Sequence, residues 1–255
     1  MTKISLPPTI KIPDGFVLES MKIEDYDDCI ELAATCFCNN NPLCVALGMS
    51  ETDFRRTALK TIRKKATIES ELSLLIRQKE SRKIVAFMFN EKMDLGIKYP
   101  MKELNKISPH TETFIELVEK CYEIAFEKSS KLAIGSLLSG KCLHAAMGGT
   151  DPKFEGLGLA KCLRRATLDV AVRKGFNTVI VEAGHGATAH VWEKYIGGVI
   201  CSKIEAASFT SKKGNQPWKD KEAGHLTILQ TKVRKNWRDS KIMRSFYLAK
   251  AAILL

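Results

Sequence analysis

Residues 147–160 read MGGTDPKFEGLGLA and join an expected strand over 141–147 to an expected helix from about 156 to 174. Gly175 then ends that helix. The unpaired N–H groups of a helix start, reinforced by the positive end of the helix dipole, bind anions without charged side chains. A glycine-rich turn lets a phosphate approach them, and a pyrophosphate fits this description.

The turn satisfies neither of the two common nucleotide-binding motifs. It lacks the G-x-x-x-x-G-K-[ST] of a phosphate-binding loop and the third glycine of the dinucleotide fingerprint. From these residues alone, an ordinary strand-to-helix turn in an α/β protein is an open alternative.

The same stretch resembles the acetyl-CoA motif of the GNAT N-acetyltransferases, V-x-P-x-x-[QR]-x-x-G-x-[GA]. Pro152, Gly158 and Ala160 occupy their places in that motif. Thr150 replaces the usual Val, and Glu155 replaces the usual Gln or Arg. In the family most phosphate bonds come from the main chain of the turn, so the resemblance still implies acetyl-CoA.

Glu155 puts an anion near the expected pyrophosphate, and Lys153, Lys161 and Arg164 are expected to offset its charge. The residues that the resemblance assigns to acetyl-CoA, including one from the second motif below, are Gly149, Thr150, Glu155, Gly156, Leu157, Gly158, Leu159, Ala160 and His185.

A second stretch, 185–198, reads HGATAHVWEKYIGG and resembles the family's N-x-x-A-x-x-L-Y-E-K-x-G-F signature. His185 takes the place of the Asn that contacts CoA. Trp192 takes the place of the Tyr that many members use to reprotonate the leaving thiolate, and an indole N–H is too weak an acid for that step. Tyr195 and Thr188 are the candidate acids, with water as the alternative.

A third stretch, 37–48, reads FCNNNPLCVALG and resembles the F-x-x-[DE]-E-P-L-x-x-A-L-G segment of arylalkylamine N-acetyltransferases. The resemblance assigns the amine acceptor to Phe37, Asn41, Pro42 and Leu43. Asn41 stands where insect-type members have the Glu that serves as base. An amide cannot accept the amine proton as a carboxylate can.

His144 is the residue expected to replace that base. It lies on the strand that enters the turn, at a place that resembles a histidine used for proton removal in vertebrate-type arylalkylamine acetyltransferases. Its ordinary pKa suits proton removal at neutral pH. A purely structural histidine, with proton removal by water, is the alternative.

The composition and the order of the expected elements favour one α/β domain. The resemblance places that domain over 14–233, with an inserted segment over about 93–139 that the resemblance does not explain, and a basic helix is expected over 234–255. The resemblance implies the GNAT acyl-CoA N-acyltransferase fold, a mixed central sheet of about six to seven strands flanked by helices, whose central strands splay beside the turn. Strands are expected over 16–21, 72–78, 84–91, 141–147, 178–183, 199–207 and 225–233, and further helices over 24–38, 50–66, 111–128 and 187–195.

The composition, with 45% hydrophobic and 27% charged residues, is typical of a soluble globular protein. No segment reaches the ~18 apolar residues of a membrane span, and residues 1–14 lack a secretory signal, which predicts a cytoplasmic protein. The eight cysteines are expected to be free thiols, with no metal site. The net charge of +11 is spread along the chain, so nucleic acid is not an expected partner. The oligomeric state is left open.

The resemblance implies direct transfer of an acetyl group from acetyl-CoA to a primary amine, with an arylalkylamine-like acceptor and no covalent enzyme intermediate. Polyamine, amino-sugar and protein-lysine acceptors stay open. A second hypothesis is a catalytically inactive acyl-CoA-binding or interaction module of the same fold. Asn41, Glu155 and Trp192, the three departures from the family pattern, support it.

Overall fold

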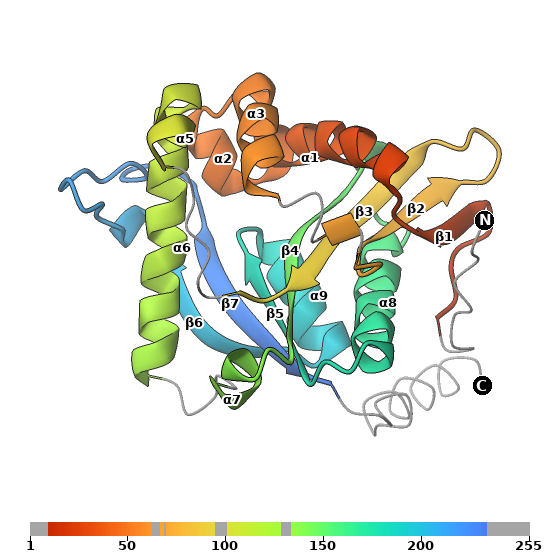
Figure 1. Cartoon of the computed structure of the whole chain (residues 1–255). Coiled ribbons are helices and arrows are strands. Elements are labelled where there is room, and N and C mark those ends of the chain that lie inside the picture. Colours follow the sequence, from red (N-terminus) through yellow and green to blue (C-terminus); the bar gives the residue numbers. More distant parts are fainter. Residues whose placement is uncertain (1–9, 63–66, 69, 95–100, 129–133, 234–255) are drawn as a thin grey trace, which may run out of the picture.

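The computed structural model describes residues 10–62, 67–68, 70–94, 101–128 and 134–233 (Figure 1). The basic helix expected over 234–255 lies outside these residues. Within them, a seven-stranded sheet has the order β1-β2-β3-β4-β5-β7-β6. The strands are β1 (Phe16–Ser20), β2 (Leu74–Gln78), β3 (Ile84–Lys92), β4 (Cys142–Thr150), β5 (Thr178–Ala183), β6 (Val199–Glu205) and β7 (His225–Lys232).

The helices that the sequence predicts occur between the strands in the expected order. They are α1 (Tyr26–Asn40), α2 (Pro42–Leu47), α3 (Glu51–Thr61), α5 (Met101–Ile107), α6 (Pro109–Lys128), α7 (Ile134–Leu138), α8 (Leu159–Arg173) and α9 (Gly186–Ile196), with short 3-10 turns η1 (Ile23–Asp25), η2 (Pro152–Phe154) and η3 (Ala206–Ser208). The short helices α2, α5 and α7 were not predicted, because five to seven residues are too few to display a helical period.

Helices cover both faces of the sheet. Leu163 of α8 and Trp192 of α9 pack in one buried cluster with Met88 of β3. Phe87 and Phe89, the neighbours of Met88 on the same strand, belong instead to a cluster with α1 and α3. This alternation is expected of a strand whose successive side chains point to opposite faces. α6 covers the β5-β7-β6 part of the second face.

The central strands β4 and β5 diverge. They pair in parallel only over Cys142–His144 and Thr178–Ile180. Beyond this point β4 continues alongside β3, whereas β5 pairs with β7 over its whole length. The parallel central pair and its splay were both expected, and Figure 1 shows the two strands separating.

The glycines of the turn have two different structural roles. Gly148 and Gly149, expected in the turn, are the last part of β4 and pair with β3. A Cβ on Gly149 would lie 2.9 Å from Cys36 Sγ, so the close approach of α1 requires this glycine. Gly156 and Gly158 both have φ of +77°, a left-handed conformation that favours glycine. The helix therefore begins at Leu159 rather than near 156.

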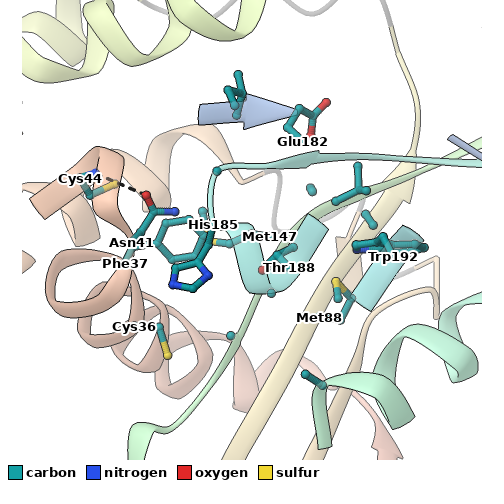
Figure 2. A pocket seen from close by; sticks show the side chains of 18 of the residues that line it. Cys36, Phe37, Asn41, Cys44, Met88, Met147, Glu182, His185, Thr188 and Trp192 are labelled. Carbon is teal, nitrogen blue, oxygen red and sulfur yellow. Dashed lines mark hydrogen bonds between the residues drawn. The ribbon is translucent and has the colours of Figure 1, made fainter. Parts of the chain in front are cut away.

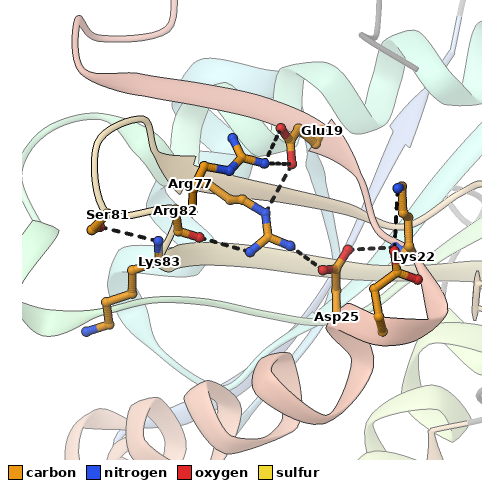
Figure 3. Close-up of polar contacts among 8 residues, drawn as sticks. Glu19, Lys22, Asp25, Arg77, Ser81, Arg82 and Lys83 are labelled. Atoms are coloured by element: carbon orange, nitrogen blue, oxygen red, sulfur yellow. Dashed lines mark hydrogen bonds and ion pairs between the residues drawn. The ribbon is translucent and has the colours of Figure 1, made fainter. Parts of the chain in front are cut away.

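An ion-pair network ties the β1 edge of the sheet together (Figure 3). The Arg77 guanidinium donates to Glu19 Oε2 at 3.1 Å from Nε and to Asp25 from Nη2. The Arg77 side chain is only 15% exposed. Arg82 also reaches Glu19, at 2.9 Å, but its side chain is 47% exposed. The network thereby joins β1, β2 and η1.

Candidate active site

A cavity of about 1410 Å³ opens where β4 and β5 diverge, and Figure 2 shows part of its lining. α1, α3 and α6 contribute to its wall together with β3, β4, β5, α8 and α9. The residues singled out from the sequence that line it are Phe37, Asn41, His144, Gly149, Thr150, Glu155, Gly156, Gly158, Leu159, Ala160, Lys161, Arg164, His185, Thr188, Trp192 and Tyr195. Pro42, Leu43 and Leu157 do not line it.

The turn before α8 is fixed by contacts at its beginning. The carboxylate of Asp151 accepts from the backbone N–H of Lys153 at 3.0 Å and pairs with Lys83 Nζ at 2.7 Å. Burial acts to raise the pKa of Asp151, but these donors outweigh it and hold the pKa below its ordinary value. The exposed Glu155 contacts Asn40 Nδ2 at 3.5 Å. Gly158, Leu159 and Ala160, at the start of α8, line the cavity. The first N–H groups of a helix have no partner within the helix, so they are candidates to bind a ligand there.

The start of α9 also faces the cavity. His185 caps this helix, since its Nδ1 accepts from the backbone N–H of Ala187 at 3.0 Å. In the neutral ring the proton therefore sits on Nε2. Tyr195, near the other end of α9, has the Lys161 ammonium 5.0 Å from its ring centroid. Both ends of the helix thus carry polar groups next to the cavity.

His144 lies between two carboxylates. Its Nε2 is 2.7 Å from Glu182 Oε2, and its Nδ1 is 3.3 Å from Glu91 Oε1. The hydroxyl of Tyr122 donates to the other oxygen of Glu182. Both ring nitrogens face acceptors, so the imidazolium form satisfies them all.

The expectation of an ordinary pKa for His144 is wrong. Burial acts to lower this pKa, but the charge and hydrogen bond of Glu182, with those of Glu91, raise it to about 10. Burial acts to raise the pKa of Glu182, and His144 and Tyr122 together bring it below its ordinary value. His144 is therefore cationic at neutral pH, and its role as a base stays a prediction that requires prior loss of its own proton.

Asn41 has a structural role, as a helix cap, that the sequence analysis missed. Its Oδ1 accepts from the backbone N–H of Leu43 at 3.0 Å and of Cys44 at 3.4 Å, which caps α2. The Leu43 side chain is fully buried, and its carbonyl accepts from Trp218 Nε1 at 3.0 Å. The Asn-Pro dipeptide, a capping residue followed by proline at the first helical position, was the available signal.

The inserted segment supplies one wall of the cavity, which the sequence analysis did not anticipate. The α6 residues that line it are Thr111, Phe114, Ile115, Val118, Glu119, Tyr122, Glu123 and Phe126. The apolar stripe of this helix was visible in the sequence, but its position against the cavity depends on packing against β6 and β7.

The cysteines, the candidate metal ligands and the longest helices were each considered for a further role. All eight cysteines are free thiols, as expected. Within the described ranges, no three His, Cys, Asp or Glu side chains cluster as metal ligands would. No described helix is both long and apolar enough to cross a bilayer.

Comparisons with protein-family models and with curated proteins find no match. Solved structures do match, at low identity. Arylalkylamine N-acetyltransferase 2 from Aedes aegypti is 19% identical, with a TM-score of 0.65 over 87% of this chain and 100% of that chain. The C-terminal condensation domain of Ebony, in complex with beta-alanyl-dopamine, is 17% identical, with a TM-score of 0.64 over 86% and 99%.

A Drosophila melanogaster polyamine N-acetyltransferase, which catalyses formation of N-acetylagmatine, is 13% identical, with a TM-score of 0.56 over 85% of this chain and 99% of that chain. These similarities extend over most of the described residues and agree with the seven-stranded mixed sheet. The chain therefore has the fold of the GNAT N-acetyltransferases.

Proposed function

We propose that this chain transfers an acetyl group from acetyl-CoA to a primary amine. The observation that carries the proposal is the divergence of β4 and β5 beside the left-handed glycines that open α8. The helix start offers N–H groups to a pyrophosphate, and the gap between the strands gives an extended arm a path to the centre of the cavity. His185, at the cap of α9, is proposed to contact the same arm.

The other end of the cavity suits an aromatic amine. Phe37 stacks on Phe54 with ring centroids 5.0 Å apart, and both rings line the cavity. Tyr122 adds a third aromatic ring from α6. The carboxylates of Glu91 and Glu182, which both contact His144, also line the cavity. These features support an arylalkylamine-like acceptor.

The proposed chemistry is direct attack of the amine nitrogen on the thioester carbon. The proton of the amine passes to water, or to His144 after that ring has lost its own proton. Tyr195 and Thr188, both on α9, remain the proposed sources of a proton for the leaving sulfur. No covalent enzyme intermediate is required.

An inactive acyl-CoA-binding module is the second candidate, and two observations favour it. The Asn41 amide is occupied as a helix cap, and His144 is held as a cation. Such a protein binds acetyl-CoA but releases no CoA in the presence of any amine.

Calorimetric titration with acetyl-CoA tests the proposal. Gly158→Trp is expected to lose binding, because the indole fills the space in front of the α8 start. Gly175→Trp is the matched control, since Gly175 has a similar φ of +81° but does not line the cavity. Absence of binding by the parent chain would contradict the proposal. Binding followed by CoA release with a panel of aromatic amines separates the enzyme from the inactive module.

A further inference from the structure

The connection between β6 and β7 contacts two walls of the end of the cavity that is proposed for the amine. We call this end, which Phe37, Phe54 and Tyr122 line, the acceptor end. We call residues 209–224 the strap, which lies beside α6 in Figure 1. No residue of the strap, all of which the structure describes, lines the cavity. Its contacts go instead to α2 and α6, two helices far apart in the sequence that each contribute to the lining.

Trp218 fixes the first turn of α2. Its side chain is fully buried, and its Nε1 donates to the carbonyl oxygen of Leu43 at 3.0 Å. Leu43 does not line the cavity, but Asn41 before it and Cys44 after it do. A Cβ on Gly184, directly after β5, would lie 3.0 Å from Leu43 Cδ1. Leu43 is therefore held by the strap and by the end of β5, and its position sets where the neighbouring lining residues stand.

Glu116 joins the strap to α6. This side chain is 8% exposed, and its carboxylate accepts from the backbone N–H of Lys212 at 2.9 Å. Lys212 Nζ also pairs with Glu119 at 2.8 Å, but both side chains are more than half exposed, so this ion pair adds little stability. Glu119 and Ile115 line the cavity, whereas Glu116 holds the strap.

The indole of Trp218 also belongs to a core that α2 and α6 share. One buried cluster contains Trp218, Leu43 of α2, and Leu117 and Cys121 of α6. Phe209, at the beginning of the strap, packs edge-on against the indole with ring centroids 5.7 Å apart. Because protein interiors are closely packed, the bulk of the indole helps to set the separation of α2 and α6. That separation is one dimension of the acceptor end.

Building on the proposed function, we infer that Trp218 is a positioning residue that determines which amines fit the acceptor end. It acts through Leu43 and through the shared core, without contacting the amine itself. The described hydrogen bonds from the strap to helices go to α2 and α6. The strap is therefore expected to influence the amine and not CoA, whose proposed site is the start of α8.

The test measures binding of the amine rather than turnover. A one-ring and a two-ring arylalkylamine are titrated by calorimetry into the protein saturated with CoA, which carries no acetyl group to transfer. Trp218→Phe keeps an aromatic ring but removes the N–H and part of the bulk. It is expected to weaken the better-bound amine by about fivefold or more, the effect of losing one hydrogen bond, and the two amines by unequal factors. The affinity for CoA should be unchanged.

Glu116→Met is the second variant, because it removes the contact of the strap with α6 and leaves the indole in place. It is expected to weaken the same amine by a smaller factor. Arg77→Met is the control for lost stability, since Arg77 belongs to the network at the β1 edge and does not line the cavity. It should leave both amine affinities unchanged. Thermal unfolding checks that each variant is folded, and Glu116→Met alone decides if Trp218→Phe is not.

Unchanged amine affinities in the strap variants would overturn the inference. Equal weakening of the two amines, an equal loss of affinity for CoA, or the same loss in Arg77→Met would also overturn it, because Trp218 would then only support the fold. A parent chain that binds the amines but releases no CoA from acetyl-CoA overturns the proposed function alone, since the affinities decide the inference. A parent chain that binds neither amine overturns both.

Discussion

Cys36 Sγ donates to the carbonyl oxygen of Thr150 across 3.2 Å, so α1 is fastened to the end of β4 where the cavity begins. The contact is possible because residue 149 has no side chain. A Cβ there would lie 2.9 Å from both Cys36 Sγ and Phe87 Cε1.

Gly149→Ala is therefore expected to destabilise the protein by about 1–3 kcal/mol, the usual cost of overpacking. Gly186→Ala is the control, because a Cβ at that position meets nothing within 4 Å. Chemical denaturation of the two variants measures the difference. If the two variants are equally stable, α1 moves to accommodate the added methyl group without a loss of stability, and the expectation is wrong.

The pH dependence of turnover is expected to reflect His144, if this residue is the base. Because its pKa is raised to about 10, kcat/KM should keep rising with pH through the neutral range. Glu182→Gln removes the main charge that raises this pKa and should move the rise to lower pH. A parent profile that levels off near the ordinary histidine value of about 6.5 would contradict the assignment.

The stability of the fold should depend on the same ionisation. A group whose folded pKa lies above its unfolded value stabilises fully below the unfolded value, and this contribution is lost as the pH rises through the folded one. For His144 the window runs from about 6.5 to about 10. The thermal unfolding temperature of the parent should fall as the pH rises across this window, relative to that of His144→Gln. Parallel curves for the two proteins would exclude the linkage.

The two arginines that share Glu19 should contribute unequally. Arg77→Met leaves the buried carboxylate of Asp25 without its guanidinium, and a loss of about 3 kcal/mol is expected. Arg82→Met removes an exposed partner of the same Glu19, and a loss below about 1 kcal/mol is expected. Urea unfolding measures both, and similar losses would refute the distinction drawn from burial.

The inserted helix α6 should influence the acceptor rather than acetyl-CoA. Val118→Trp fills part of the cavity from α6 and is expected to raise KM for the amine at least several-fold. Binding of acetyl-CoA should be unchanged, because the helix start and the diverging strands lie on other elements. Glu127→Trp, at an exposed position of α6 outside the cavity lining, is the matched control.

The parts of the site that are local in sequence could be predicted from the sequence. The order of β4, α8 and β5 and the turn at 156–160 follow from periodicity and glycine placement within about forty residues. The environment of His144 could not be predicted in this way. Its partners Glu91 and Glu182 lie 53 residues before it and 38 after it, and only the assembled sheet brings them together.

Arg164 illustrates the same limit. Arg164 was expected to offset the charge of Glu155, as any basic residue near the turn would. Its burial and its lack of a carboxylate partner depend on how α8 packs against α9. A helical wheel shows which face of α8 carries the arginine, but it does not show what occupies the opposite side.

The three-residue contact between β4 and β5 also has a consequence for the whole sheet. The sheet is in effect two half-sheets, β1-β2-β3-β4 and β5-β7-β6, that share one short seam at Cys142–His144 and Thr178–Ile180. Beyond the seam, the β5-facing edge of β4 has no strand partner within the described residues. A molecule inserted between the two halves would therefore lie against this edge of β4, in place of the neighbouring strand that the edge lacks there.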